Sequence, residues 1–491
     1  NDGQSGLATS NTYKYYLNNS LKKTTTATSY KFTGLTAGTS YKIKVEAYDK
    51  ANNKGTDTEN ISTIPFESQP TPEPDQGETE LSDADKANGV IEIKWLNGTS
   101  NKVSENPNAP QVKTISNGTM ELVKYTGEGS TEKERWIVGT EYNYLPGEGS
   151  SDNTSSKWAN ARVTIDGIDS YFVWIPRYAY RIIYFDSAES KKAYQEGTLT
   201  EADAKAQGKI KGYSDSRGIV DSEGKKVANV TSTTKEMVSE DYFMTHPAFL
   251  ADADIGGGFG NNNGTNDNGI SGIWIGKYET SESSSQLKVQ PNVSSLSNVN
   301  IGNMYKYAAK YSTELESHML KNSEWGAVAY LAESRYGRNG TEIGMNTNSE
   351  YITGGGAYNA YATTNQDQST TGNVYGIYDM RGGAYEYVAS YYTGGKYLNN
   401  GSSFTNTKTS DKYATAYTGT SASTSYKYGD ATYETSGWHS DVAIFVNSPY
   451  PFFERGGHCR LDAPYAGVFC FNSSAGYADG GVSFRLALCV E

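Results

Sequence analysis

An acidic, proline-rich segment most constrains what this chain can fold into, because it separates the sequence into two parts. Residues 65–80 read PFESQPTPEPDQGETE and hold four prolines and five acidic residues. Prolines favour extended backbone and like charges repel one another, so this composition is typical of a semi-rigid linker. The sequence therefore predicts an N-terminal domain over residues 1–64, a linker over 65–80 and a C-terminal domain over 81–491.

The N-terminal part ends in a clear strand pattern. Alternate residues from Tyr41 to Ala47 are apolar, which predicts a half-buried strand. The residues before it, Leu35, Gly38 and Thr39, resemble with Tyr41 the tyrosine corner of a fibronectin type III domain. Such domains run to about a hundred residues, which is more than stand before the linker. The resemblance implies a partial fibronectin type III-like β-sandwich that lacks its first strands and acts as a spacer.

Composition favours a strand-rich, extracellular protein and argues against several function classes. Among 491 residues there are 40 Tyr and 52 Gly, and the formal net charge is −13. The charge shows no basic cluster of the kind that nucleic-acid binding requires. No run of 18 apolar residues is present, so the chain as given is not expected to span a membrane. Because it opens inside a domain, we expect a missing N-terminus that carries any signal or anchor.

The C-terminal part predicts an α+β domain of small sheets, two helices and long loops. Its apolar runs predict strands, one of them ended by Pro176, and its 3.6-residue spacing predicts helices, the last of them capped by Ser323. The expected strands span 90–95, 171–178 and 270–280. Of the two expected helices, one spans 298–316 and the other begins at Ser323; a further short helix is expected at 201–207, and a glycine-rich loop at 256–269.

Three short motifs occur in a fixed order along the C-terminal part. They are Asn322-Ser323-Glu324-Trp325, the run 376–388 (GIYDMRGGAYEYV), and Arg455-Gly456-Gly457 closing with Ser483-Phe484-Arg485. In this order they resemble the formylglycine-generating-enzyme branch of the C-type lectin fold, over roughly residues 90 to 491. The resemblance implies a packed scaffold in which aromatic pairs lock small sheets and glycines allow tight turns. Its scaffold residues are Trp325, Glu386, Trp438, Arg455, Gly456, Gly457, Phe469, Phe471, Phe484 and Arg485.

The catalytic residues and metal ligands of that family are only partly present. In the enzyme two cysteines five residues apart bind copper, whereas here Cys459 is followed by Cys470, eleven residues on. We therefore expect no enzyme, and keep a copper-dependent oxidase as an alternative. Some relatives hold calcium at the turn where Gly383 here replaces an Asn, although Glu386 remains. The resemblance leaves calcium open as a cofactor and names no other.

The C-terminal tail is the strongest functional signal in the sequence. The frame from Arg455 to Gly457 and from Ser483 to Arg485 encloses chemically varied fillings, a pattern that resembles the variable region (about 455–485) of diversity-generating-retroelement target proteins. In those systems adenines, mostly in Asn codons, are randomised, and such codons cannot become Lys, Glu, Gln, Met or Trp. These five types make up 88 of 491 residues, yet none lies between His458 and Val490.

The resemblance and the strand pattern together predict a variable binding face. A strand over Gly467–Asn472 would turn Phe469 and Phe471 toward the core and Cys470 and Asn472 outward. Cys459 and Cys470 would then be products of randomisation, and Cys489 a buried small hydrophobe. The expected face comprises His458, Cys459, Arg460, Leu461, Asp462, Tyr465, Cys470, Asn472, Ser473, Ser474, Tyr477, Asp479 and Val482.

These predictions describe a non-catalytic binding protein. Tyr465 and Tyr477 are the expected aromatic anchors, and Arg460 and Asp462 the expected charge-specific contacts. We expect a protein or other macromolecular surface target, no nucleic-acid partner, and multivalent display because a single face is small. The expected location is extracellular or at the surface of a bacterium or phage, such as a fibre tip. A structural surface or fibre subunit remains the alternative.

Overall fold

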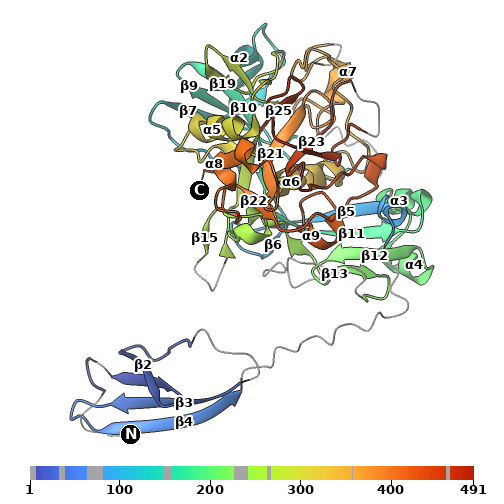
Figure 1. The fold of residues 1–491 in the computed structure, drawn as a ribbon. Helices are drawn as coiled ribbons and strands as arrows, with labels where there is room; N and C mark the ends of the chain where they lie inside the picture. Colours follow the sequence, from blue (N-terminus) through green and yellow to red (C-terminus); the bar gives the residue numbers. More distant parts are fainter. Residues whose placement is uncertain are drawn as a thin grey trace. The chain divides into compact units, whose positions relative to one another are not determined.

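The structure, a computed structural model, describes residues 7–10, 12–32, 39–62, 81–147, 156–225, 241–262, 267–355, 358–460 and 465–490. The described chain is mostly β-sheet with few helices, which agrees with an α+β or β-rich class. It divides into two compact units, residues 1–78 and residues 79–491, called unit 1 and unit 2 (Figure 1). No helix in the described ranges is long and apolar enough to cross a membrane.

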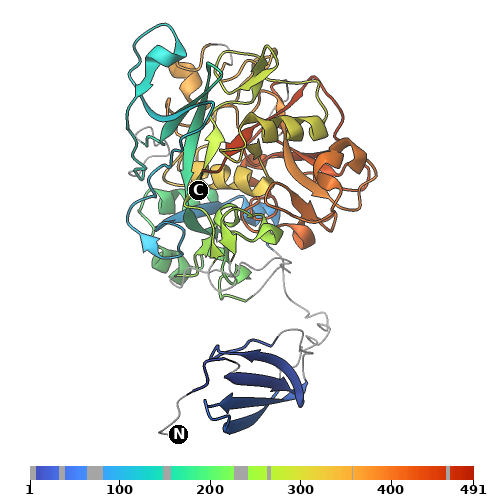
Figure 2. The same cartoon turned by 90° about the vertical axis from the view of Figure 1, so that its left-hand side faces the viewer.

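Unit 1 is an antiparallel sheet in the order β2–β1–β3–β4 (Figure 2). Its strands are β1 (Tyr13–Leu17), β2 (Ser20–Thr25), β3 (Ser40–Tyr48) and β4 (Lys54–Ser62). The predicted strand from Tyr41 to Ala47 is confirmed within β3. Within the described part of this unit, all four strands lie in this one sheet. Leu35 and Gly38 of the predicted tyrosine corner lie outside the described residues.

The described part of unit 2 is built on three sheets and two hairpins. The seven-stranded sheet runs β20 (His318–Met319), β26 (Leu486–Leu488), β17 (Gly272–Gly276), β10 (Ile168–Pro176), β9 (Asn160–Ile165), β7 (Gly118–Tyr125) and β8 (Trp136–Val138). The six-stranded sheet runs β13 (Gly218–Asp221), β12 (Ile210–Asp215), β11 (Tyr178–Phe185), β5 (Gly89–Leu96) and β6 (Val103–Ser104), with β14 (Met244–Thr245) on β11. The hairpins are β15 (Asn261–Asn262) with β16 (Asp267–Asn268), and β18 (Ser281–Ser283) with β19 (Gln286–Lys288).

The third sheet of unit 2 carries the tail. It runs β22 (Thr415–Tyr417), β21 (Tyr385–Tyr392), β23 (Phe452–Arg455) and β24 (Phe471–Ser474), and β25 (Val482–Phe484) pairs with β21. Figure 1 shows β21, β23 and β25 side by side in the orange and red part of the chain. Strand β24 pairs with β23, and its first residue, Phe471, also bridges Ala443, so among the named strands β24 is the last on this side of the sheet.

One apolar run connects the first two sheets. Strand β10 ends at Pro176, as predicted, because proline has no amide hydrogen to continue the ladder. The chain then enters β11 at Tyr178, in the six-stranded sheet. Every residue from 170 to 185 is buried, which is why the run is apolar on both faces rather than alternating. The predicted strand at 90–95 is confirmed within β5, and the one predicted at 270–280 is the shorter β17, which spans 272–276.

Two longer helices pack among the sheets. Helix α5 (Ile301–Tyr311) lies inside the predicted range 298–316, and the Asn300 side chain caps it. Helix α6 (Asn322–Glu333) is wholly buried. The predicted cap at Ser323 is wrong, because the Ser323 hydroxyl donates to the Gly256 carbonyl at 2.5 Å. The helix start is satisfied instead by Glu324, whose carboxylate accepts from the Lys321 amide at 2.8 Å.

The remaining helices are short. They are α1 (Asp83–Lys86), α2 (Glu132–Arg135), α3 (Ala188–Gln195), α4 (Glu201–Ala206), α7 (Thr363–Gln366), α8 (Ser402–Thr405) and α9 (Ala422–Ser425), with 3-10 turns at Pro247–Phe249, Ala253–Ile255, Leu398–Gly401 and Trp438–Ser440. The predicted helix at 201–207 is confirmed as α4, whereas the polar α3 was not predicted. The predicted loop 256–269 contains the small β15–β16 hairpin.

Candidate binding face

A buried ion pair fixes the end of the tail. The Arg485 guanidinium meets the Glu386 carboxylate at 2.5 and 3.1 Å, and donates to the Gly276 carbonyl at 2.9 Å. The two side chains are 0 and 1 % exposed. Removing either partner would leave a charge buried and uncompensated. The chain between β25 and β26 is thereby held to both β21 and β17.

Trp325 of helix α6 contacts the tail at two places. Its indole N–H donates to the Val468 carbonyl at 2.7 Å, and the Arg455 guanidinium lies 5.5 Å from its ring centroid. Arg455 in turn donates to the Ala431 carbonyl at 2.9 Å. Burial lowers the pKa of Arg455 to about 10, which leaves the guanidinium charged at neutral pH. Helix α6 therefore positions both ends of the first tail filling.

Two glycines lie where the tail closely approaches another part of the chain. Gly457 has a φ of 81°, and a Cβ there would lie 2.2 Å from the Ala466 Cα. A Cβ at Gly467 would lie 1.9 Å from the Asp441 carboxylate, whose other oxygen accepts from the Phe469 amide at 3.0 Å. Larger residues at either position would break these contacts. The segment 466–470 is thus drawn inward as a turn.

The floor of the face is formed by three neighbouring strands. Glu454 on β23 stands opposite Asn472 on β24 and opposite Tyr387 on β21. The Tyr387 hydroxyl lies 2.9 Å from the Ser474 hydroxyl and donates to the Tyr477 carbonyl at 3.0 Å. Burial raises the pKa of the Glu454 carboxyl to about 7, while hydrogen bonds from Ser474 and Tyr387 oppose the shift. The floor therefore combines tyrosines with one carboxyl that titrates near neutrality.

His458 forms one rim of the face. Its Nε2 lies 2.7 Å from the Tyr351 hydroxyl, and its Nδ1 accepts from the Arg460 amide at 3.1 Å. The imidazole also packs against Tyr385, with ring centroids 6.0 Å apart. Burial, reinforced by the Arg460 charge, lowers the pKa of His458. The ring is therefore neutral at pH 7 and is held between two tyrosines.

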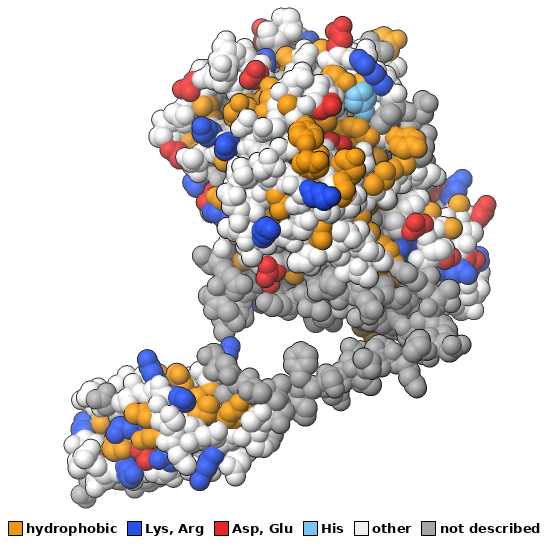
Figure 3. Space-filling view, viewed as in Figure 1, with side chains coloured by type: hydrophobic (Ala, Val, Ile, Leu, Met, Phe, Trp, Pro, Cys, Tyr) orange, Lys and Arg blue, Asp and Glu red, His pale blue; other side chains and the backbone are white. Residues whose placement is uncertain are grey.

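Tyr477 forms the opposite rim. It is 54 % exposed, and its ring lies 5.7 Å from that of Tyr397. The next turn is fixed because the Asp479 carboxylate accepts from the Gly481 amide at 2.7 Å. Figure 3 shows hydrophobic side chains, a class that includes tyrosine, gathered beside a histidine on the surface that carries this sheet. The rims thus present aromatic rings to solvent.

The predicted face residues fall into three groups. Those exposed are Arg460, Tyr465, Tyr477 and Asp479; those half-buried are His458, Asn472, Ser473 and Ser474; those buried are Cys459, Cys470 and Val482. Leu461 and Asp462 lie outside the described residues. The predicted scaffold residues, by contrast, are all buried.

Three predictions about the face are wrong. The strand begins at Phe471 rather than Gly467, because the contacts of Val468 and Phe469 with α6 and Asp441 hold the preceding segment in a turn. Cys470 is 1 % exposed and therefore does not point outward. Cys459 is 6 % exposed, and Val482 pairs with Tyr385 inside the sheet. Cys489 is buried at 4 %, as predicted.

The sequence prediction missed the part of the face that lies outside the tail. Tyr351, Tyr385, Tyr387, Tyr397 and Glu454 all contribute to it. The tyrosine count of the sequence was high, but no local pattern assigned these tyrosines to the tail. The face therefore has a fixed aromatic part and a part that belongs to the predicted variable region.

The possible calcium site and the copper alternative concern the same part of the structure. A Cβ at Gly383 would lie 2.4 Å from Glu279, so the position of the missing Asn is filled by that carboxylate. Glu386, the remaining candidate ligand, directs both oxygens to Arg485. Burial raises the pKa of the Cys459 thiol, and that of Cys470 to about 12, so both are protonated at neutral pH. In the ranges that the structure describes, no group of three or more His, Cys, Asp or Glu could hold a metal ion.

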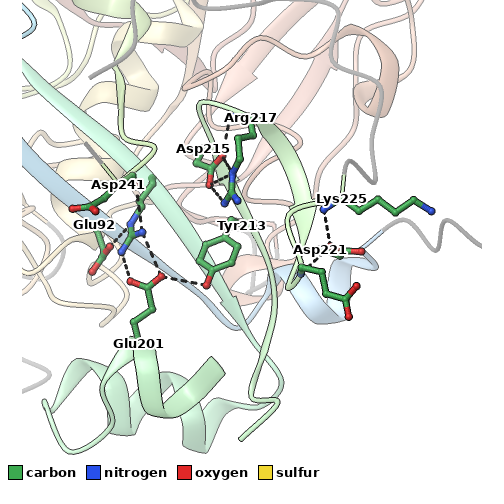
Figure 4. Close-up of polar contacts among 10 residues, drawn as sticks. Glu92, Glu201, Tyr213, Asp215, Arg217, Asp221, Lys225 and Asp241 are labelled. Carbon is green, nitrogen blue, oxygen red and sulfur yellow. Dashed lines mark hydrogen bonds and ion pairs between the residues drawn. The ribbon is translucent and has the colours of Figure 1, made fainter. Parts of the chain in front are cut away.

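A second polar cluster lies on the six-stranded sheet. Arg181 pairs at 2.5 Å with both Glu92 and Glu201. The Tyr213 hydroxyl donates to Glu201 at 3.2 Å, so α4 is joined to β12 (Figure 4). A cavity of about 610 Å³ beside it is lined in part by the same two glutamates. Because both carboxylates are engaged by Arg181, we interpret the cluster as structural.

No protein-family model matches the chain, and no curated protein matches it.

Proposed function

We propose that this chain is a non-catalytic binding protein that displays a hypervariable face on a C-type lectin-like fold of the formylglycine-generating-enzyme type, diversified by a retroelement. One observation carries the proposal. The tail combines exposed and half-buried residues with predicted frame residues that are all buried, and it lacks the five residue types that adenine randomisation of Asn codons cannot produce. A fixed frame under varied surface chemistry is what a reusable binding face requires.

Recognition would rest on rigid aromatic contacts with charged residues around them. Tyr465 and Tyr477 are 50 and 54 % exposed, so each can bury a large ring in a partner at small entropic cost. Arg460 and Asp479 supply exposed charge of both signs, in the role predicted for Arg460 and Asp462. The expected partner is a protein or another macromolecular surface, and multivalent display would raise the affinity of a small face.

Two alternatives predict different results. A structural fibre subunit would keep its function when the exposed tail residues become Ala, Ser or Gly. A copper-dependent oxidase would retain copper through Cys459, a role that its buried, protonated thiol disfavours. Titration of the purified chain with copper, followed by removal of free metal, distinguishes this case: retained stoichiometric copper would favour the oxidase.

The direct test of the proposal is genomic. We expect a near-copy of the bases that encode the tail, differing from it only where the copy has adenine, beside a reverse-transcriptase gene. A flanking region without either feature would refute diversification by a retroelement.

A second test addresses binding itself. A display library randomised at positions 460, 465, 472, 477 and 479 should stay folded and yield binders to an arbitrary protein such as lysozyme. A matched library at the exposed positions 102, 128, 192, 196 and 205 should stay folded and yield fewer. Equal yields from both libraries would argue against a specialised face.

A further inference from the structure

Unit 1 is basic although the chain as a whole is acidic. Residues 1–64 hold eight lysines, no arginine and five acidic residues, so their formal charge is +3 in a chain whose formal net charge is −13. Among the charged side chains of unit 1 that Figure 3 shows, blue ones outnumber red ones. A surface whose charge is opposite to that of the whole chain indicates an anionic partner.

The strand register places four of these lysines on one face of the sheet. Alternate residues of a strand share a face, and so do residues that pair across neighbouring strands. Lys14 pairs with Glu46, and Lys54 pairs with Tyr48, two residues further along β3. Lys42 and Lys44 precede Glu46 on β3 by four and two residues, so they share its face. We call this surface the lysine face; its lysines are Lys14, Lys42, Lys44 and Lys54.

The acidic residues of β4 do not neutralise the lysine face. Asp57 and Glu59 pair with Val45 and Ile43, which alternate with the lysines of β3. Both carboxylates therefore lie on the opposite face of the sheet. Within the described strands of unit 1, Glu46 is the one acidic residue on the lysine face.

Glu46 holds several side chains of the lysine face in place. It is 4 % exposed, and its carboxylate accepts from the Lys44 and Lys54 ammonium groups at 3.0 and 3.2 Å. The same carboxylate accepts from the Tyr16 and Tyr48 hydroxyls at 2.8 and 2.9 Å. One buried carboxylate thus positions two ammonium groups and two tyrosines, and the face as a whole stays positive.

The other two lysines are available to an anion. Among the described residues, no carboxylate forms an ion pair with Lys14 or Lys42. The Lys14 Nζ lies 3.4 Å from the Tyr48 hydroxyl and 4.5 Å from the centroid of its ring, and Lys42 is exposed. Their charges therefore have no counter-ion on the protein.

A polar cavity of about 520 Å³ lies beside Lys14. Lys14 pairs with Thr24 on β2, so both side chains bring the cavity onto the lysine face. Its acidic residue, Asp49, already accepts from the backbone and side-chain nitrogens of Asn53 at 2.7 and 2.8 Å. Hydroxyl and amide groups such as these suit a ligand that carries hydroxyls. The polar lining residues are Ser10, Lys14, Thr24, Tyr48, Asp49 and Asn52.

The type of cation on the lysine face favours phosphate. A lysine ammonium binds phosphate as a point charge, whereas the planar fork that recognises carboxylate belongs to arginine. Arginine is absent from residues 1–64. A phosphate diester carries a single charge on a tetrahedral group, which a point charge can approach from several directions.

The arrangement of the face favours a polymer with separated charges and no bases. Alternate residues of a strand lie about 6.8 Å apart, so Lys42 and Lys44 suit one charge per repeat rather than a dense cluster. The Lys44 Nζ lies 3.9 Å from the Tyr16 ring centroid, and Lys14 covers Tyr48 in the same way. Rings covered by lysines leave little surface on which nucleic-acid bases could stack.

We propose that the lysine face binds a linear polyol phosphate polymer, with one phosphate diester in each repeat. Successive phosphates lie against the lysines, and a hydroxyl-bearing unit enters the cavity beside Lys14. Unit 1 is then a docking element and not a spacer alone. This role is independent of the proposed function, because it involves no residue of the tail.

Binding of the whole chain to immobilised poly(glycerol phosphate) tests the proposal. We expect saturable binding at about 50 mM salt that weakens at least tenfold by about 200 mM, because bound phosphates release their counter-ions. An absence of binding, or binding that salt leaves unchanged, would overturn the proposal. Tighter binding to polyglutamate, to single-stranded DNA or to phosphatidylglycerol vesicles would replace the polyol phosphate with a carboxylate polymer, a nucleic acid or a membrane, and each result would overturn it.

Variants of equal charge then test the face itself. Lys14→Gln with Lys42→Gln should weaken the binding at low salt at least tenfold. The matched control is Lys23→Gln with Lys31→Gln, because Lys23 pairs with Tyr15 on the opposite face and Lys31 lies outside the four strands. The control should bind like the wild type. Equal losses in the two variants would show that net charge alone attracts the polymer, and would overturn the lysine face as a site.

Discussion

Replacing Glu386 with Gln tests whether the tail is a buried frame beneath a tolerant face. The substitution keeps the size of the side chain but leaves the Arg485 guanidinium, 0 % exposed, without a counter-charge. Breaking a buried ion pair by removing one partner costs about 3 to 5 kcal/mol. Because Gln still offers one carbonyl oxygen to Arg485, we expect a loss of free energy of unfolding near the lower value, about 3 kcal/mol.

Urea unfolding followed by tryptophan fluorescence measures this loss. All 7 tryptophans lie in unit 2, so the signal reports on the unit that carries the tail. The matched control is Tyr477→Ala, at a position 54 % exposed, which should change the free energy of unfolding by no more than about 0.5 kcal/mol. Equal losses in the two variants would refute the separation of frame from face. The double variant Glu386→Leu with Arg485→Met should recover much of the loss.

Three further predictions concern the same region. The folded pKa of Glu454 is about 7, above its ordinary 4.5. The stability that this carboxyl contributes is therefore complete below pH 4.5 and is lost as pH rises through 7. Glu454→Gln should flatten that part of the profile of unfolding free energy against pH. Gly457→Ala forces a Cβ to 2.2 Å from the Ala466 Cα at a φ of 81°, so urea unfolding should show a loss of about 1 to 3 kcal/mol or more. The buried thiol of Cys470 should react with a thiol reagent only after unfolding, whereas a fast reaction of the native chain would contradict its burial.

The strands and helices that the sequence predicted correctly share a strong local pattern. The alternation in β3 and the long apolar run through β10 depend on burial along one element, and such patterns are visible without knowing the partner. The Ser323 cap failed for the opposite reason. Its hydroxyl is drawn to Gly256, a residue 67 positions away, and no local rule weighs that contact against helix capping.

The strand predicted in the tail failed for the same reason as the Ser323 cap. Alternation from Gly467 to Asn472 predicted a strand with Cys470 outward, yet long-range contacts through Trp325 and Asp441 hold the segment as a buried turn. The frame residues could be identified because their types are restrictive: glycines at close crossings and charged or aromatic residues in the core. Which filling residues reach solvent depended on the fold of the whole unit.

The face combines tyrosines outside the predicted variable region with residues of the tail. Variation in the tail would therefore change more than the tail's own contacts. Tyr351, Tyr385 and Tyr397 lie outside the predicted variable region, so every version of the tail would meet the same rings. His458 packs against the first two of these, at ring-centroid distances of 5.2 and 6.0 Å, and Tyr477 packs against the third. A substitution at either position therefore both removes one contact and changes how much of a fixed tyrosine ring is uncovered. Under the proposed function, a few variable positions would thus alter the shape of a larger aromatic surface, with the fixed tyrosines supplying contact area and the tail deciding which part of it a partner can reach.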